Sequence, residues 1–447
     1  MTGTSRTRAE LADLLGSRRI EHVVVLGANG AMGYGSGAVF TTVVPRVTFL
    51  ARTKERAAQG LKSAIHAVRS STVANHVDTG DYEGSFDEAV SKADLVFEAL
   101  TEDLDIKRRM FERVDKVRRP DSIVATVSSG LSINALAEGR SESFKKHFLG
   151  LHFFNPPNVI VGAELIAGKA TDPKLVEFVD AFATKKLGRV MIRTADRPGF
   201  AGNRVGFKVL NEAAQLAEEH GPVLVERLVG PYTGRAMTPL ATIDLVGWEI
   251  HRAIVDNIYD NAADEAHATL KLPGYMDSLI EEGTLGTKSG RGFFKTENKV
   301  KLVLDPKTSG YRPLAEVKLP DLRFIDEIAK LHHDGRYKEA MQVFMDAPGD
   351  WAALARKVVA GYVSYAFHRV GEVTETIAGI DDIMGFGFNW APPSVLVDVI
   401  GVKETVHMIE RSKLPVPRVL ADVAKSGTSK RFYTNPHGNV GRFFVAG

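Results

Sequence analysis

The stretch "HVVVLGANGAMGYGSGAVF", residues 22–40, decides the fold of this chain. Its opening, "HVVVLG", is a β-branched run that is typical of a strand buried on both faces in a parallel sheet. A glycine-rich turn follows and leads into a helix, an order that suits a pyrophosphate, because glycines allow close approach and the helix N-terminus offers free N–H groups. The alternative is a simple flexible turn. We favour a dinucleotide-binding turn, which would be built by Gly27, Gly30, Ala31, Met32 and Gly33.

Strand and helix patterns continue to alternate up to about residue 195. Further strands are expected at 46–53, 93–100, 121–129, 149–156, 162–168 and 187–196. This order predicts a doubly wound α/β sheet of the Rossmann type, at 21–195, after an N-terminal extension of residues 1–20. Long amphipathic helices dominate the remaining sequence, so we expect an all-α C-terminal region.

The helical region contains an internal repeat. Three motifs recur in the same order: Pro-x4-Asp-x2-Gly at 239–247 and 393–401, Lys-Leu-Pro at 271–273 and 413–415, and "SGRGFF" at 289–294 with "NVGRFF" at 439–444. Duplication explains this better than chance does. We predict two related helical domains, 196–295 and 346–447, with 296–345 as a linker.

Composition narrows the classes of partner and chemistry. Lys and Arg number 57 against 55 Asp and Glu, which argues against a nucleic acid or an anionic membrane as partner. There is no cysteine, so disulfides, cysteine-based zinc sites and thiolate catalysis are excluded. We assign no metal ligands. The sequence shows neither an apolar run long enough to span a bilayer nor a signal peptide, so a cytoplasmic location is the expectation.

The end of the second strand, "FLARTKER" (49–56), lacks the acidic residue that usually binds the ribose 2′-hydroxyl of NAD. Ala51 stands there, and Arg52 follows it. A small residue and a guanidinium suit a 2′-phosphate, because arginine can bind phosphate in a bidentate manner. The sequence therefore favours tolerance or preference for NADP. The alternative is that Arg52 is a solvated surface charge and NAD binding is merely weakened.

The segment "GLHFFNPPNVIVGAELIAG" (150–168) contains the strongest catalytic candidates, His152 and Glu164. Histidine is a natural general base near neutral pH, and a carboxylate on its far nitrogen fixes the tautomer and stabilises the imidazolium. We expect Pro156 and Pro157 to end the strand that carries His152, and "GAEL" to form the neighbouring strand. The alternative is a histidine that only fills the core.

Several blocks together resemble the L-3-hydroxyacyl-CoA dehydrogenases: "HFFNPP" with its later glutamate, "EALTEDLDIKRRMFERVD", "SSGLSI" and "RPGFAGNRV". The resemblance runs from about residue 20 to the end. It includes the duplicated C-terminal domain that larger members of the family have, but no hydratase part. It implies that the acyl-CoA lies between a dinucleotide-binding domain and a helical domain. Three departures stand out: a glycine loop one residue longer, Ala51 in place of the ribose-binding Asp, and Val127 in place of an Asn.

Site residues follow from this resemblance by position. His152 matches the catalytic base and Glu164 its partner, while Ser129 and Asn203 match polar groups that hold the substrate oxygen. Glu102 and Lys107 match polar residues on the nicotinamide side. Each has a plainer alternative: Ser129 and Asn203 as helix caps, and the Glu102–Lys107 stretch as a solvated helix face.

The resemblance implies an oxidoreductase that interconverts (S)-3-hydroxyacyl-CoA and 3-ketoacyl-CoA with NAD or NADP. We expect a monomer with an internal pseudo-dimer, or a weak homodimer, and association with other β-oxidation enzymes is compatible with it. Two alternatives stay open. One is a dehydrogenase of the same architecture for a hydroxy substrate without CoA, and the other is a non-catalytic subunit of a β-oxidation complex.

Overall fold

The computed structural model describes residues 8–427 and 430–434, and the chain divides into two compact units. The first comprises the described residues up to Phe200 together with Glu372–Gly387. The second holds Ala201–Gly371 and the described residues from Phe388 onward. Two of the expected features touch residues outside the described part: the first seven residues of the N-terminal extension and the motif at 439–444.

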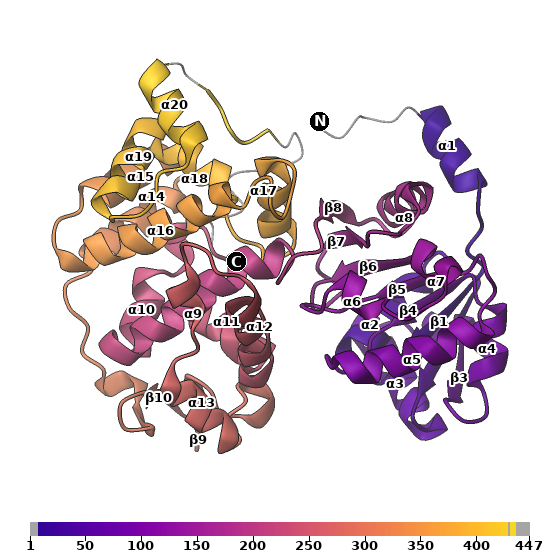
Figure 1. Ribbon diagram of the computed structural model, residues 1–447. Helices are drawn as coiled ribbons and strands as arrows, with labels where there is room; N and C mark the ends of the chain where they lie inside the picture. Colours follow the sequence, from indigo (N-terminus) through magenta and orange to yellow (C-terminus); the bar gives the residue numbers. More distant parts are fainter. Residues whose placement is uncertain (1–7, 428–429, 435–447) are drawn as a thin grey trace. The chain divides into compact units, whose positions relative to one another are not determined.

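An eight-stranded sheet forms the centre of the first unit, in the order β3-β2-β1-β4-β5-β6-β7-β8 (Figure 1). The strands are β1 His22–Leu26, β2 Arg46–Ala51, β3 Val77–Asp81, β4 Leu95–Glu98, β5 Ile123–Thr126, β6 Phe148–Phe153, β7 Gly162–Ala167 and β8 Val190–Thr194. All neighbours pair in parallel except β6 and β7, which are antiparallel. β3 is a strand that the sequence patterns did not indicate.

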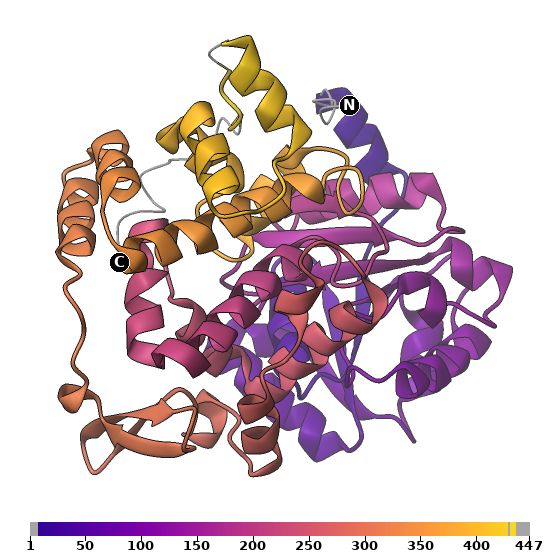
Figure 2. The ribbon, with the colours of Figure 1, turned by 60° about the vertical axis from the view of Figure 1, so that its left-hand side comes forward.

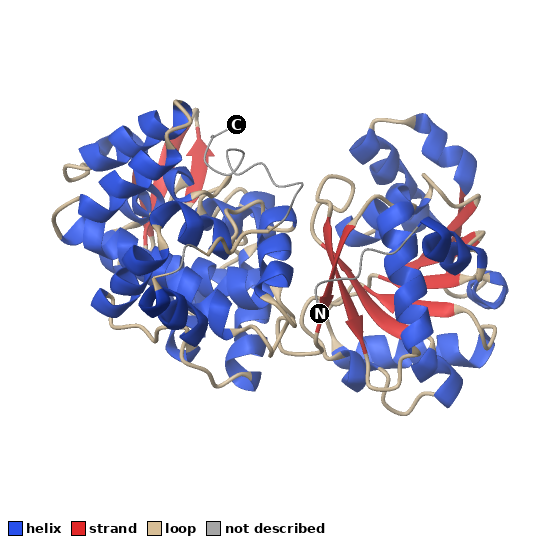
Figure 3. Ribbon diagram, turned by 90° about the horizontal axis from the view of Figure 1, so that it is seen from above, coloured by secondary structure: helices blue, strands red, loops and turns tan. Residues whose placement is uncertain are grey.

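Helices cover both faces of this sheet (Figure 3). One face carries α2 Ala31–Phe40, α3 Lys54–Val68 and α8 Pro173–Lys185, and the other carries α4 Phe86–Lys92, α5 Leu104–Val117, α6 Ile133–Leu136 and α7 Glu142–Lys146. Alternate residues of β1 point into the two cores: Val23 and Val25 into one, Val24 and Leu26 into the other. The predicted doubly wound α/β fold is confirmed. In the extension, α1 (Arg8–Gly16) contacts α8.

A segment from far along the chain completes the first unit. Helix α17 (Ile377–Phe386) packs on β7 and β8, and the N–H of Ala195 donates to the carbonyl of Val373 at 2.9 Å. Gly162, at the start of β7, allows this approach, because a Cβ there would lie 2.6 Å from the backbone nitrogen of Gly387. The first unit is therefore built partly from sequence that the patterns assigned to the second helical domain.

The second unit is mostly helical. Its first half contains α9 Gly202–His220, α10 Pro222–Leu228, α11 Pro239–Val246, α12 Trp248–Asn261 and α13 Gly274–Glu281. Its second half contains α16 Asp350–His368, α18 Pro393–Ile400, α19 Val402–Arg411 and α20 Arg418–Ser426. Within the described residues, no helix is both long enough and apolar enough to cross a bilayer.

The segment 296–345, expected as a linker, contains regular structure. A small antiparallel sheet forms from β9 Phe294–Glu297, β10 Val300–Asp305 and β11 Gly310–Pro313, and Figure 2 shows it joined to the following helices by an extended stretch. Those helices are α14 Arg323–His333 and α15 Tyr337–Asp346. Because α15 packs on α18, this segment adds to the core of the second half.

Candidate active site

The glycine-rich turn has the backbone geometry that close approach requires. Gly27 directly follows β1 and has φ +79°, and α2 begins at Ala31 after Gly30. A Cβ on Gly33 would lie 2.2 Å from the carbonyl oxygen of Gly27, so helix and strand meet here only because residue 33 is a glycine. Ala31 is exposed, and the first N–H groups of α2 lack helical acceptors, as at every helix start. The longer loop therefore keeps a helix N-terminus available to an anion.

His152 and Glu164 face each other on the antiparallel pair β6–β7. Nδ1 of His152 lies 2.7 Å from Oε2 of Glu164, and Nε2 lies 3.2 Å from Oγ of Ser129. A carboxylate accepts only, so Nδ1 carries the proton and Nε2 is left to accept from the Ser129 hydroxyl. This tautomer leaves the base nitrogen on the side of Ser129.

The imidazole lies in a largely apolar setting. His152 is 3% exposed and Glu164 is fully buried. The rings of Phe154 and Phe200 lie 4.8 and 5.8 Å from the imidazole, centroid to centroid. Because water is largely excluded here, the interaction between the imidazole and the carboxylate is weakly screened.

Glu102 holds the loop that carries Ser129. Its Oε1 accepts from the Ser128 hydroxyl at 2.6 Å and from the N–H groups of Ser129 and Gly130 at 2.8 and 2.9 Å. Ser132, and not Ser129, caps helix α6. Ser129 is therefore free of the capping role that was its alternative, and a carboxylate fixes its backbone.

Lys107 is not on a solvated helix face. It is fully buried, and its Nζ lies 2.6 Å from Oε1 of Glu98 and 3.5 Å from Oε2 of Glu102. Glu98, at the end of β4, is also fully buried. Sequence reasoning missed Glu98, although a carboxylate that ends an otherwise apolar strand was a usable signal.

Asn203 belongs to the second unit, where it stands in the first turn of α9 and is buried. The residue before the helix is Ala201, so Asn203 does not act as the N-cap. Its predicted role toward the substrate stays a prediction.

The end of β2 presents no carboxylate. Ala51 is buried as the last residue of the strand, Arg52 is exposed, and the side chain of Thr53 caps α3 by accepting from the N–H of Arg56 at 3.3 Å. The nearest acidic side chain in sequence, Glu55, lies in the first turn of α3. A guanidinium and a helix N-terminus thus share this edge of the sheet.

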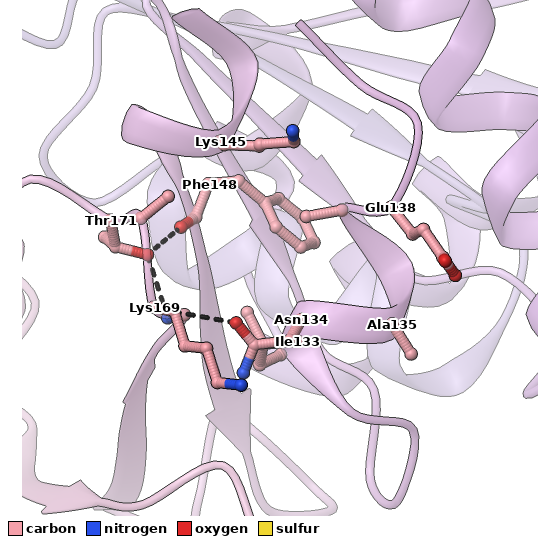
Figure 4. Close-up of a pocket in the computed structure, with 11 residues that line it drawn as sticks. Ile133, Asn134, Ala135, Glu138, Lys145, Phe148, Lys169 and Thr171 are labelled. Atoms are coloured by element: carbon pink, nitrogen blue, oxygen red, sulfur yellow. Dashed lines mark hydrogen bonds between the residues drawn. The ribbon is translucent and has the colours of Figure 1, made fainter. Parts of the chain in front are cut away.

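A separate cavity of about 390 Å³ lies at the other end of β6, beside Phe148 (Figure 4). Two of its polar side chains are hydrogen-bonded within the fold: Thr171 donates to the carbonyl of Phe148, and the side-chain oxygen of Asn134 accepts from the N–H of Lys169. None of the candidate site residues lines it, so the site assigned from His152 is a different place in the first unit.

Comparisons with known families cover most of the chain. Residues 22–197 match the model described as "3-hydroxyacyl-CoA dehydrogenase, NAD binding domain", and residues 199–296 match "3-hydroxyacyl-CoA dehydrogenase, C-terminal domain". The chain is 30% identical over 293 residues to the human protein named hydroxyacyl-coenzyme A dehydrogenase, mitochondrial, a match that covers 62% of this chain and 91% of that protein.

Two further relatives extend over nearly the whole chain. A Bacillus subtilis protein named probable 3-hydroxyacyl-CoA dehydrogenase is 30% identical over 452 residues, which cover 95% of this chain and 56% of that protein. The chain thus spans little more than half the length of that relative. The crystal structure of a 3-hydroxybutyryl-CoA dehydrogenase from Escherichia coli aligns with a TM-score of 0.66, over 92% of this chain and 100% of that one. At 21% identity, this likeness supports the fold alone.

Proposed function

This chain belongs to the 3-hydroxyacyl-CoA dehydrogenase family, and on that premise we propose that it interconverts (S)-3-hydroxyacyl-CoA and 3-ketoacyl-CoA, with NAD(P) as the hydride carrier. The observation that carries this proposal is the His152–Glu164 pair, whose nitrogen and oxygen lie 2.7 Å apart. The other imidazole nitrogen, Nε2, carries no proton and lies beside the hydroxyl of Ser129. A base with a fixed tautomer and a hydroxyl next to it is what oxidation of a secondary alcohol requires of the protein.

The first unit fits a dinucleotide. The helix start at Ala31 and the close contacts that only Gly27 and Gly33 permit form a cradle where a backbone can approach a pyrophosphate. Gly60 belongs to the same packing, because a Cβ there would lie 2.3 Å from the carbonyl oxygen of Ala28. When bound, the nicotinamide cofactor accepts or gives up the hydride.

The protein's own contribution is the proton and its position. In the oxidation, Nε2 of His152 takes the proton of the substrate hydroxyl, and Glu164 stabilises the imidazolium that forms. In the reverse direction the imidazolium returns this proton to the keto oxygen. Ser129 donates to the oxygen as charge develops there, and we assign the same task to Asn203 from the second unit.

Replacement of the base is the direct test. We expect His152→Gln to lower kcat for acetoacetyl-CoA reduction about a thousandfold, because glutamine cannot take up or release the proton. His76→Gln is the matched control, since His76 is exposed and its ring hydrogen-bonds the carbonyl of Pro45. Wild-type-like turnover by the folded His152→Gln protein would remove the assignment.

The substrate class is tested with the same assay. Reduction of acetoacetyl-CoA without reduction of free acetoacetate supports the acyl-CoA substrate. Activity on the free acid points instead to a dehydrogenase for a substrate without CoA. If wild-type protein binds neither NADH nor NADPH in a fluorescence titration, it is a non-catalytic subunit.

We further propose that the cofactor site accepts NADP. The support is the absence of a carboxylate at Ala51, together with the exposed Arg52 beside the helix start capped by Thr53. We expect Arg52→Ala to lower kcat/KM with NADPH roughly tenfold while kcat/KM with NADH changes little. Lys54→Ala, at the first residue of α3, is the control and should leave both values of kcat/KM nearly unchanged. A strong NADH preference in the wild-type protein would end this proposal.

The second unit supports the proposal of a monomer with an internal pseudo-dimer. Helices α9 and α16 contact each other, Nε of Arg204 donates to the hydroxyl of Tyr365 at 2.6 Å, and the N–H of Ala391 donates to the carbonyl of Gly234. The two helical halves thus pack against each other within a single chain. Light scattering should give a mass near 48.7 kDa, and an obligate dimer joined through a helical half would contradict the proposal.

A further inference from the structure

We infer that Glu98 is a positioning residue for this site: through Lys107 and Glu102, its buried carboxylate fixes the loop that presents Ser129 to His152. The connection to catalysis rests on the proposed function, whereas the connection to the loop rests on the contacts alone. Every group in the chain of contacts belongs to the first unit.

The first step runs from Glu98 to its immediate partners. Oε1 accepts from Nζ of Lys107 at 2.6 Å and from the N–H of Leu100 at 2.5 Å. Oε2 accepts from the hydroxyl of Thr126, the last residue of the neighbouring strand β5, at 2.5 Å. Both oxygens are thus engaged, and the carboxylate joins the ends of β4 and β5 to helix α5.

The second step runs from Lys107 to the loop. Nζ of Lys107 lies 3.5 Å from Oε2 of Glu102, whose other oxygen receives the hydroxyl of Ser128 and the successive N–H groups of residues 129–131. Thr126 also holds the loop directly, because its hydroxyl oxygen accepts from the N–H of Ser128 at 3.1 Å. The loop is therefore held by two routes that both begin at Glu98.

A buried ion pair is weak evidence for stability, since the cost of removing two charges from water offsets much of their attraction. Here the pair has a second consequence. The ammonium of Lys107 attracts one oxygen of Glu102, and the successive N–H groups of residues 129–131 donate to the other. Such a run of N–H groups is suited to binding an anion. Because Ser129 Oγ stands 3.2 Å from Nε2 of His152, a small shift of the loop would take it out of hydrogen-bond distance.

Hydrogen exchange of the ligand-free protein tests the structural part. We compare peptides that cover 126–136 by mass spectrometry in the wild type, Glu98→Gln, Thr126→Val and Thr126→Ser. Glu98→Gln and Thr126→Val should exchange roughly tenfold faster at these amides, because the loop loses its anchor. Thr126→Ser keeps the hydroxyl and should exchange like the wild type.

The control is Glu88→Gln. It makes the same chemical change in another carboxylate–lysine pair, Glu88 and Lys92 at 2.7 Å, but that pair is exposed. Its peptides over 126–136 should be unchanged. Thr126→Val also covers the case in which Glu98→Gln does not fold, because it leaves no buried charge without a partner.

Turnover tests the catalytic part. In Thr126→Val and folded Glu98→Gln, kcat should fall roughly ten- to a hundredfold, while KM for acetoacetyl-CoA changes less than threefold, because the loop positions Ser129 rather than binding the acyl-CoA. Thr126→Ser should restore kcat. Unchanged loop exchange in Thr126→Val would overturn the inference, as would faster exchange with wild-type kcat. A wild type without dehydrogenase activity would instead refute the proposed function and leave the exchange result to decide the anchor.

Discussion

The two halves of the helical unit share one arrangement, in which an aspartate carboxylate accepts from two successive backbone N–H groups; we call this arrangement the frame. In the first half, the carboxylate of Asp244 accepts from the N–H groups of residues 293 and 294 at 2.9 and 3.1 Å. In the second, Asp398 accepts from those of residues 432 and 433 at 2.8 and 2.9 Å. The donors to Asp398 thus belong to "KRFY" (430–433), whereas "NVGRFF" lies outside the described residues. A shared frame with altered surroundings supports our proposal of duplication.

The halves differ where they leave this frame. Asn211 donates to the carbonyl of Lys271, and Ser364 to that of Pro415, so each half fixes its own Lys-Leu-Pro segment. With these two positions aligned, Asn203 corresponds to Arg356, whose guanidinium bonds backbone carbonyls. The second half also lends α17 to the first unit. This contrast fits our proposal that Asn203 acts on the substrate from the first half, and that the second half has a structural role.

The largest expected effect separates the halves by activity. We expect Asn203→Ala to lower kcat about a hundredfold, because a short donor to a developing oxyanion is lost. Arg356→Gln, at the corresponding position of the second half, should leave kcat unchanged once the folded fraction is matched. Steady-state kinetics with acetoacetyl-CoA measures both. Equal losses in the two variants would show that the halves do not differ in this way.

The next effect compares the two carboxylates of the frame. Asp244 also accepts from the indole N–H of Trp248 at 2.7 Å, so Asp244→Ala leaves three donors without this acceptor, two of them buried. Asp398→Ala leaves two donors, both only partly buried. We expect losses in the free energy of unfolding of about 3 and about 1–2 kcal/mol. Urea unfolding followed by tryptophan fluorescence measures them. A larger loss for Asp398→Ala would reverse the ranking.

A smaller effect is expected in the first half, where the pKa of Glu226 makes the free energy of unfolding depend on pH. Burial raises the pKa of Glu226 to about 7, although the N–H of Leu240 and the hydroxyl of Thr238 donate to it. The folded pKa lies above the unfolded one, so the stability linked to this proton is present below about pH 4.5 and is lost as pH rises through 7. Glu226→Gln should remove roughly 2 kcal/mol of the fall in stability between pH 5 and pH 8. Glu219→Gln, an exposed control, should keep the wild-type profile.

The sequence predicted what depends on local pattern. Strands of a parallel sheet are buried on both faces and are therefore apolar. This pattern identified β1, β2, β4 and β5 in the sequence. The pairing of His152 with Glu164 was also accessible, because a short connection between two strands places such residues opposite each other. The family blocks then supplied their roles as expectations.

What the sequence did not indicate depends on tertiary packing. The strand β3, "VDTGD", lies at the edge of the sheet and is mostly polar, so it shows no apolar run. In the small sheet, β9 and β11 are short and largely exposed, and only β10, "VKLVLD", has an apolar pattern. The docking of α17 on β7 and β8 joins segments that are far apart in the sequence. Gly162 makes room for it, but a single glycine does not identify such a contact in a sequence. Glu98 was overlooked because its buried partners, Lys107 and Thr126, lie on other elements, so its pairing is visible only in the structure.

The smallest expected effect tests whether the frame is truly shared. Gly247 and Gly401 precede α12 and α19 with φ of +103° and +102°, a region that side chains with a Cβ avoid. The nearest obstacles to a Cβ are flexible ends, Nζ of Lys288 and Oε2 of Glu404, so backbone strain sets the cost. Gly247→Ala and Gly401→Ala should therefore each lower the free energy of unfolding by a similar amount, about 1 kcal/mol. Calorimetry of both variants measures the two losses, and losses that differ more than threefold would mean that the two glycines do not play the same part.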